Sequence, residues 1–89
     1  MTYTVVWRNE ARRALSNLRA ADPASAKSLA AAVRELAANP RPEGSNQLGG
    51  SRFWRLRLAG LRVLYEIDDV ADAVHVYNVG RVPPHSAGR

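Results

Sequence analysis

The stretch from Phe53 to Ile67 constrains the fold more than any other part of the chain. Apolar residues recur at every second position on either side of Ala59-Gly60, where the first half reads Phe-Trp-Arg-Leu-Arg-Leu and the second Leu-Arg-Val-Leu-Tyr-Glu-Ile. A period of two places successive side chains on opposite faces of a strand. A two-residue segment ending in Gly suits a tight hairpin turn. The stretch therefore predicts two antiparallel strands, Phe53–Leu58 and Leu61–Ile67.

The turn also predicts which side chains of this hairpin share a face. The apolar face would hold three cross-strand pairs: Trp54 with Tyr65, Leu56 with Val63, and Leu58 with Leu61. The opposite face would hold Phe53, Arg55 opposite Leu64, and Arg57 opposite Arg62. Like charges directly across a strand pair are destabilising unless an anion or a carboxylate lies between them, so the arginines predict an anion-binding surface. The alternative is a solvated outer face whose arginines bind nothing.

Phe53 lies on the same predicted face as the arginines, at the start of its strand. An exposed aromatic ring among arginines could stack on a nucleobase. The alternative is a rim residue that the preceding loop covers.

Two helices are predicted between an opening strand over Tyr3–Trp7 and the hairpin. Asn9 can cap the first helix. Asp22-Pro23 ends that helix and begins the second, with Asp22 as N-cap and proline at the first helical position. The second helix ends at Asn39-Pro40, because proline disfavours helical geometry in the residue before it. Apolar residues at helical spacing in both segments predict an antiparallel helical hairpin.

The predicted order is β-α-α-β-β-β, of the α+β class: an N-terminal strand, a two-helix antiparallel hairpin and a three-stranded antiparallel sheet. The last strand is Ala73–Val79, after an acidic turn. Residues 41–50 are rich in Pro, Gly, Ser and Asn, which predicts a loop within the domain. With 89 residues there is room for one core. Residues 1–89 are therefore expected to form a single domain, with residues 80–89 as a tail.

Composition excludes several kinds of site. Cysteine is absent, which removes thiol nucleophiles, disulfides and thiolate metal sites. His75 and His85 fit no recognised zinc spacing, so neither a metal nor a cofactor is expected. Met1–Trp7 lacks the basic start of a secretory signal, and no apolar run reaches the roughly 20 residues of a membrane helix. A cytoplasmic protein without a membrane partner is expected.

The charge balance indicates an anionic partner. The chain has 13 basic and 8 acidic residues, a net charge of +5, and Lys27 is its only lysine. Arginine binds phosphate bidentately and stacks on bases, so this bias suits RNA or DNA. A genome of high GC content is the alternative explanation, because it favours arginine over lysine.

The segment Trp54–Asp69 resembles the central hairpin of the RelE/ParE superfamily of bacterial toxins. Those proteins carry an alternating basic and apolar strand, a Gly-containing turn, then Arg-Val-(Leu/Ile)-Tyr and an acidic turn. The sequence Glu-Ala-Arg-Arg-Ala-Leu over Glu10–Leu15 and the Val79–Arg81 ending also fit this pattern. The resemblance spans nearly the whole chain. It implies the toxin of a type II toxin–antitoxin system, with the RelE-like branch favoured.

The RelE branch comprises endonucleases that cut messenger RNA in the ribosomal decoding site, by attack of a ribose 2′-OH on the adjacent phosphate without a metal. By this resemblance Arg62 would stabilise the phosphate and Arg81, after the last strand, would be a second catalytic residue. Arg55 and Arg57 stand where some relatives carry lysines and would bind RNA phosphates. The implied partners are a cognate antitoxin, expected to cover the basic sheet with an acidic helical segment, and the 70S ribosome with its mRNA.

Two departures from the family pattern concern proton transfer. Arginine stays protonated, so Arg55 and Arg57 suit phosphate binding better than general-base catalysis. Many relatives carry a tyrosine in the C-terminal tail, but Val82–Arg89 has none. His85 is the tail residue able to carry a proton near neutrality. Two alternatives stay open: a ParE-like toxin that inhibits DNA gyrase without nuclease chemistry, and a plain nucleic-acid-binding module.

Overall fold

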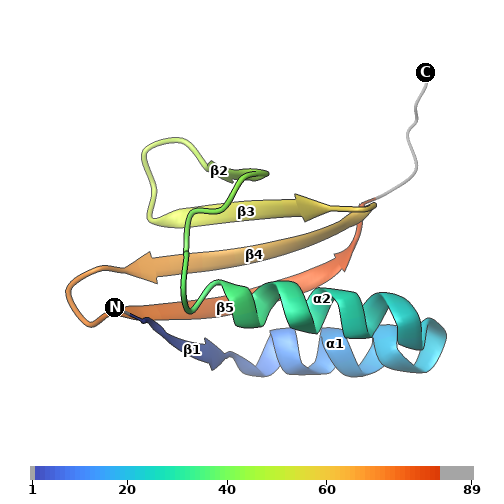
Figure 1. Cartoon of the computed structure of the whole chain (residues 1–89). Coiled ribbons are helices and arrows are strands. Elements are labelled where there is room, and N and C mark those ends of the chain that lie inside the picture. The colour runs from blue at the N-terminus through green and yellow to red at the C-terminus, as the bar shows by residue number, and fades with distance from the viewer. Residues whose placement is uncertain (1, 83–89) are drawn as a thin grey trace, which may run out of the picture.

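The computed structural model describes residues 2–82 and confirms the α+β class. Its elements follow in the order β1 (Thr4–Trp7), α1 (Asn9–Ala21), α2 (Pro23–Glu35), β2 (Ser45–Gln47), β3 (Phe53–Leu58), β4 (Leu61–Asp68) and β5 (Ala73–Arg81). The two helices lie side by side against one face of the sheet, with α1 packed on β5 and α2 in contact with β4 (Figure 1). Within residues 2–82, no helix has the length and apolar character to cross a membrane.

The strands form one mixed sheet in the order β1-β5-β4-β3-β2. β1 pairs in parallel with β5, whereas the other neighbouring strands are antiparallel. The sequence predicted fewer strands, because β2 lies inside the segment predicted as the loop 41–50. β2 reads Ser-Asn-Gln and has no apolar alternation, so only its backbone pairing with β3 makes it a strand. β5 also continues past the predicted end at Val79 to Arg81.

The β3–β4 hairpin has the register that its turn predicted. The pairs include Trp54 with Tyr65, Leu56 with Val63, Arg57 with Arg62, and Leu58 with Leu61. Ala59 and Gly60 both have positive φ, at 46° and 80°. This left-handed backbone is what a two-residue hairpin turn requires. The turn therefore fixes which side chains face the helices.

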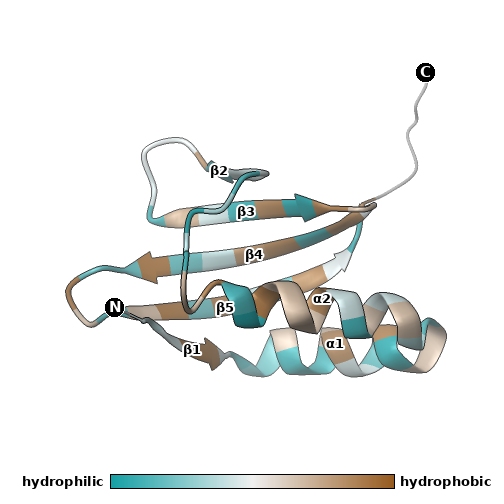
Figure 2. Cartoon of the chain, in the orientation of Figure 1, coloured by the Kyte–Doolittle hydropathy of each residue, from teal (hydrophilic) through white to brown (hydrophobic). Residues whose placement is uncertain are grey.

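The covered face of the sheet and the helical hairpin share one apolar core. Its fully buried side chains include Leu29, Val33, Leu36, Val63, Tyr65, Val74 and Val76. Trp7 and Trp54 are partly buried and pack against this cluster. Along β4 buried residues alternate with half-buried ones, and hydrophilic bands interrupt the hydrophobic ones (Figure 2). One face of the sheet thus packs against the helices, and the opposite face is available for binding.

The two helix starts had different outcomes. Asp22 caps α2 as predicted: its carboxylate accepts a hydrogen bond from the backbone N–H of Ser25 at 3.2 Å. The predicted cap at Asn9 was wrong, because Asn9 is already the first helical residue and the N-cap position is Arg8, which makes no side-chain cap. The backbone N–H of Arg8 still donates to β5 at Val76, so the chain passes directly from strand pairing into the helix. α2 ends at Glu35, and turn residues lead to Asn39.

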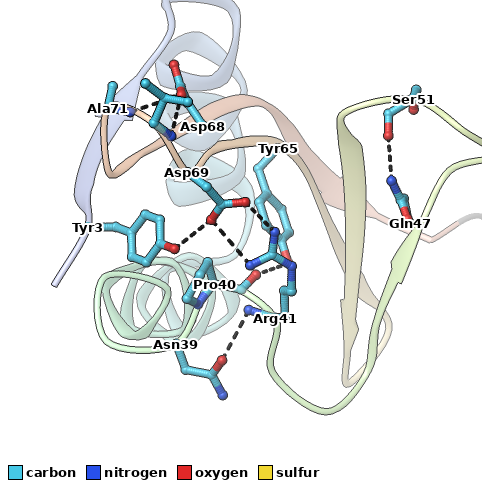
Figure 3. Close-up of polar contacts among 11 residues, drawn as sticks. Tyr3, Asn39, Pro40, Arg41, Gln47, Ser51, Tyr65, Asp68, Asp69 and Ala71 are labelled. Carbon is cyan, nitrogen blue, oxygen red and sulfur yellow. Dashed lines mark hydrogen bonds and ion pairs between the residues drawn. The ribbon is translucent and has the colours of Figure 1, made fainter. Parts of the chain in front are cut away.

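A polar cluster ties three distant segments together beside β4. The hydroxyl of Tyr3 donates to Asp69 at 2.6 Å, and Arg41 forms an ion pair with the same carboxylate at 2.8 Å (Figure 3). Nearby, the buried hydroxyl of Tyr65 donates to the carbonyl of Pro40 at 2.8 Å. The hydrogen bonds from Arg41 and then Tyr3 hold the pKa of Asp69 below its usual value. The cluster joins the start of β1, the loop after α2 and the β4–β5 turn.

This lowered pKa makes Asp69→Asn a test of the cluster by acidification. The unfolded chain binds a proton at Asp69 at higher pH than the folded chain does, so the carboxylate's contribution is complete above the unfolded pKa of about 3.9. It is lost as the pH falls through the folded pKa. When the pH is lowered from about 7 to about 3, the urea unfolding midpoint should therefore fall less for Asp69→Asn than for the unchanged protein. Glu43→Gln, at an exposed carboxylate, is the control; an equal fall in all three proteins would contradict the assignment.

Candidate nucleic-acid interface

The face of the β3–β4 hairpin turned away from the helices carries Arg55, Arg57 and Arg62, which we call the arginine face. Leu56 and Val63, at the alternate positions, are 5% and 0% exposed in the core. Side chains at neighbouring positions of a strand point to opposite faces, so the three arginines share the uncovered one. Arg57 is exposed, whereas Arg55 and Arg62 are half-buried. The structure thus brings together the three hairpin arginines that the sequence singled out.

Arg62 is held across β5 rather than toward Arg57. Its guanidinium donates a hydrogen bond to the backbone carbonyl of Arg81. Gly80 is the residue opposite Arg62 on β5, and a Cβ atom there would lie only 3.5 Å from Nη1 of Arg62. The Arg62 guanidinium therefore lies over Gly80, at ordinary van der Waals distance from a methyl group placed there. This orientation also lessens the repulsion expected between the cross-strand neighbours Arg57 and Arg62.

Arg55 carries a polar atom without a partner. Its Nε is buried and makes no hydrogen bond within residues 2–82. A desolvated donor without an acceptor is unfavourable, more so when the group is charged. An external anion would reach this atom only if the side chains that cover it moved.

Arg81 does not join the other predicted site residues. It pairs with Leu61, a core residue that is 2% exposed, so its side chain lies on the helix side of the sheet. There its guanidinium forms an ion pair with Asp22. Hydrogen bonds from Ser25, and then from Arg81, lower the pKa of the Asp22 carboxyl. Only the backbone of Arg81 contacts the arginine face, through its carbonyl and Arg62.

A β-bulge explains the position of Arg81. Leu64 pairs with Asn78 while the next residue, Tyr65, pairs with Val76, so Tyr77 is an extra residue in β5. If β5 had no bulge, the alternation of side chains from His75 onward would place Arg81 on the same face as Arg62. One inserted residue exchanges the faces of everything that follows it. The spacing of the apolar residues carried the signal, because Val74 and Val76 are followed by Val79 rather than by residue 78.

Phe53 lies on the uncovered face as predicted and is 36% exposed. The structure adds a neighbour that sequence reasoning did not place with it: the ring of Tyr77 meets it edge-to-face with centroids 5.4 Å apart. Between them on β4, Glu66 accepts a hydrogen bond from the Tyr77 hydroxyl at 3.2 Å and pairs with Arg52 at 2.7 Å. The aromatic pair thus extends the arginine face toward the other end of β3.

The two histidines contribute differently. His75 lies opposite Glu66 on β5, and its Nδ1 is buried without a hydrogen-bond partner in the described part of the chain. The predicted proton carrier His85 lies outside the described residues. Among residues 2–82, no group of three or more His, Cys, Asp and Glu side chains could hold a metal ion.

The family model for the ParE toxin of the type II toxin–antitoxin system, parDE, matches residues 5–82. The chain belongs to this toxin family. The toxin's sequence matches no curated protein.

Solved structures share the toxin's fold. A chain of the archaeal RelE–RelB complex from Pyrococcus horikoshii is 22% identical with a TM-score of 0.79, and the match covers 98% of the toxin and 100% of that chain. A chain of a RelBE-type complex from Mycobacterium tuberculosis is 24% identical with a TM-score of 0.77, covering 91% and 99%. A mutant of the E. coli toxin RelE in the free state is 25% identical with a TM-score of 0.70, covering 91% and 84%. The predicted membership of the RelE/ParE superfamily is confirmed.

Proposed function

We propose that this toxin is a ribosome-dependent mRNA endonuclease that cuts messenger in the decoding site and so inhibits translation. The observation that carries the proposal is the arginine face, where one exposed and two half-buried arginines share the side of the sheet opposite α1 and α2. Guanidiniums bind phosphate bidentately and with charge-assisted hydrogen bonds.

The proposed step needs no metal. The ribose 2′-oxygen attacks the adjacent phosphorus as it loses its proton, the bond from phosphorus to the 5′-oxygen breaks, and that oxygen takes up a proton. The products are a 2′,3′-cyclic phosphate and a 5′-hydroxyl. Arg62 would stabilise the charge that develops on the phosphate oxygens, while Arg55 and Arg57 would bind the flanking phosphates. None of these arginines can act as general base, and His85 is our candidate for carrying a proton.

Primer extension on programmed ribosomes tests this proposal. Purified toxin should cut messenger within the decoding-site codon, and neither naked RNA nor the Arg62→Ala protein should give these ends. Intact messenger, produced by folded protein that still arrests growth on expression, would refute the nuclease.

We also propose that a cognate antitoxin stores the toxin by covering the arginine face with an acidic helical segment. Two of the similar solved structures are toxin–antitoxin complexes of the RelE–RelB type, which supports a partner of this kind. Binding would neutralise Arg57 and block access of RNA to Arg62. Release of the antitoxin would therefore be required for activity.

A second candidate function is inhibition of DNA gyrase without nuclease chemistry. It is favoured by the ParE description of the matching family model and by the inability of arginine to act as a general base. It predicts DNA breaks rather than cut messenger. It also predicts that changes to the α1–α2 hairpin reduce toxicity more than Arg62→Ala does.

Arg81→Ala distinguishes a catalytic guanidinium from a backbone anchor. The substitution keeps the carbonyl that accepts from Arg62 and removes only an exposed ion pair with Asp22, and such pairs add little stability. We expect toxicity to be retained, with a loss of cleavage below about tenfold, since removing a direct transition-state donor costs about 10²–10³-fold. Single-turnover cleavage rates check this. A loss as complete as that of Arg62→Ala would restore Arg81 to the catalytic role that the resemblance implied.

A further inference from the structure

The aromatic pair beside the arginine face includes the bulged residue of β5. Phe53 is on β3 and Tyr77 on β5, with β4 between them in the sheet. Tyr77 is the extra residue of β5, and its ring contacts Phe53 across Glu66. In an edge-to-face pair each ring keeps at least one face that the other does not cover. Phe53 and Val70 are the large hydrophobic residues that are exposed within residues 2–82, and only Phe53 lies on the sheet.

Positive charge lies beside this aromatic pair. The guanidinium carbon of Arg8 lies 5.8 Å from the centroid of the Tyr77 ring, and Arg55 is the next residue along β3 on the same face as Phe53. The nearby carboxylate of Glu66 is compensated by Arg52 and receives the Tyr77 hydroxyl, so it does not present a free negative charge. The surface therefore combines an exposed aromatic ring with cations on two sides.

A nucleotide has the complementary chemistry, since its base is a flat aromatic system and its phosphates are anionic. Base stacking on aromatic side chains is the common means by which proteins hold single-stranded RNA. Phe53 and Arg57 are four residues apart on β3, about 13 Å at the rise of a strand. A single strand lying along β3 could thus place a base at Phe53 and phosphates at Arg55 and Arg57.

We propose that Phe53 and Tyr77 form a stacking site for one nucleobase of single-stranded RNA, with Arg8 and Arg55 contacting the adjacent phosphates. The proposal rests on the proposed function in taking RNA as the ligand of the arginine face. It adds a base-dependent contact to a surface otherwise defined by phosphate binding. Tyr77 supports Phe53 through the ring contact and is itself held by Glu66.

Matched oligonucleotides isolate the base contact. The probe is a short fluorescent oligouridine, compared with an oligomer of equal length in which every residue is abasic, with anisotropy recorded at low salt. The unchanged toxin should bind the base-bearing oligomer roughly 5- to 150-fold more tightly. Phe53→Leu keeps an apolar side chain but has no ring, and should lose this preference. Phe53→Tyr restores a ring and should keep it.

Arg57→Ala is the control for phosphate binding. It should weaken binding of both oligomers by the same factor and reduce the salt dependence by about one phosphate contact. Val70→Ala, at the exposed apolar residue in the β4–β5 turn, should change neither affinity. Equal affinity of the unchanged toxin for the two oligomers, or binding of neither, would overturn the stacking site. So would a preference that survives in Phe53→Leu.

The oligonucleotide-binding assay and the nuclease assay test the two proposals independently. A base preference that Phe53→Leu abolishes, found together with intact messenger on ribosomes, would leave the stacking site standing and refute the endonuclease. Cut messenger, found together with no base preference, would support the endonuclease and refute the stacking site.

Discussion

Arg62→Ala is expected to abolish growth arrest while the protein stays folded. Arg62 is half-buried on the uncovered face, where its guanidinium lies over Gly80 and donates to the carbonyl of Arg81. No core side chain depends on it. Loss of a donor positioned for transition-state charge lowers the rate by about 10²–10³-fold. Expression without antitoxin should therefore permit growth, and the thermal unfolding midpoint should stay close to that of the unchanged toxin.

Arg62→Lys and Arg34→Ala are the informative companions. Lysine keeps the charge but lacks the planar fork of donors that could hold both the Arg81 carbonyl and a phosphate, so it should recover only part of the activity. Arg34→Ala removes the same unit of charge at an exposed position near the end of α2. Because Arg34 does not contact the arginine face, toxicity should be unchanged. A fully toxic Arg62→Ala protein would remove Arg62 from the mechanism.

The arginine face could be predicted from sequence because two local signals agreed on the hairpin. The period-two pattern defined both strands, and Ala59-Gly60 set the number of residues in the turn. A tight turn fixes the register, and the register fixes the face of every side chain. Nothing beyond the hairpin was needed to place Arg57 opposite Arg62.

The surroundings of Arg62 depended on parts of the chain with weaker signals. The face of Arg81 is reversed by a single extra residue at Tyr77, and alternation alone gives the opposite answer. β2 was missed because its three polar residues form a strand only by pairing with β3. The parallel neighbour of β5 is β1, and their pairing joins residues 69 positions apart in the sequence, such as Thr4 and Ala73 (73 − 4 = 69). Local patterns do not encode such long-range contacts, so they came only from the structure.

Leu29→Ala is expected to produce the largest loss of stability, about 2–5 kcal/mol in the free energy of unfolding. Leu29 is fully buried in α2, and removing three carbons loses both the apolar transfer energy and the packing around the resulting cavity. A small domain has only about 5–15 kcal/mol in total, so this is a substantial fraction. Urea unfolding measures it. Lys27→Ala, at an exposed position of the same helix, should stay within about 0.5 kcal/mol.

The two substitutions should reduce toxicity by different routes. Arg62→Ala changes the chemistry of every folded molecule, whereas Leu29→Ala reduces how many molecules are folded. Cleavage per folded molecule should therefore be normal in Leu29→Ala, and a partner that binds only the folded state should recover much of its stability by mass action. If the folded fraction of Leu29→Ala cleaved as poorly as Arg62→Ala, packing of α2 under the sheet would have to control the arginine face directly. If it cleaves normally, the helices act as a scaffold and the chemistry belongs to the hairpin.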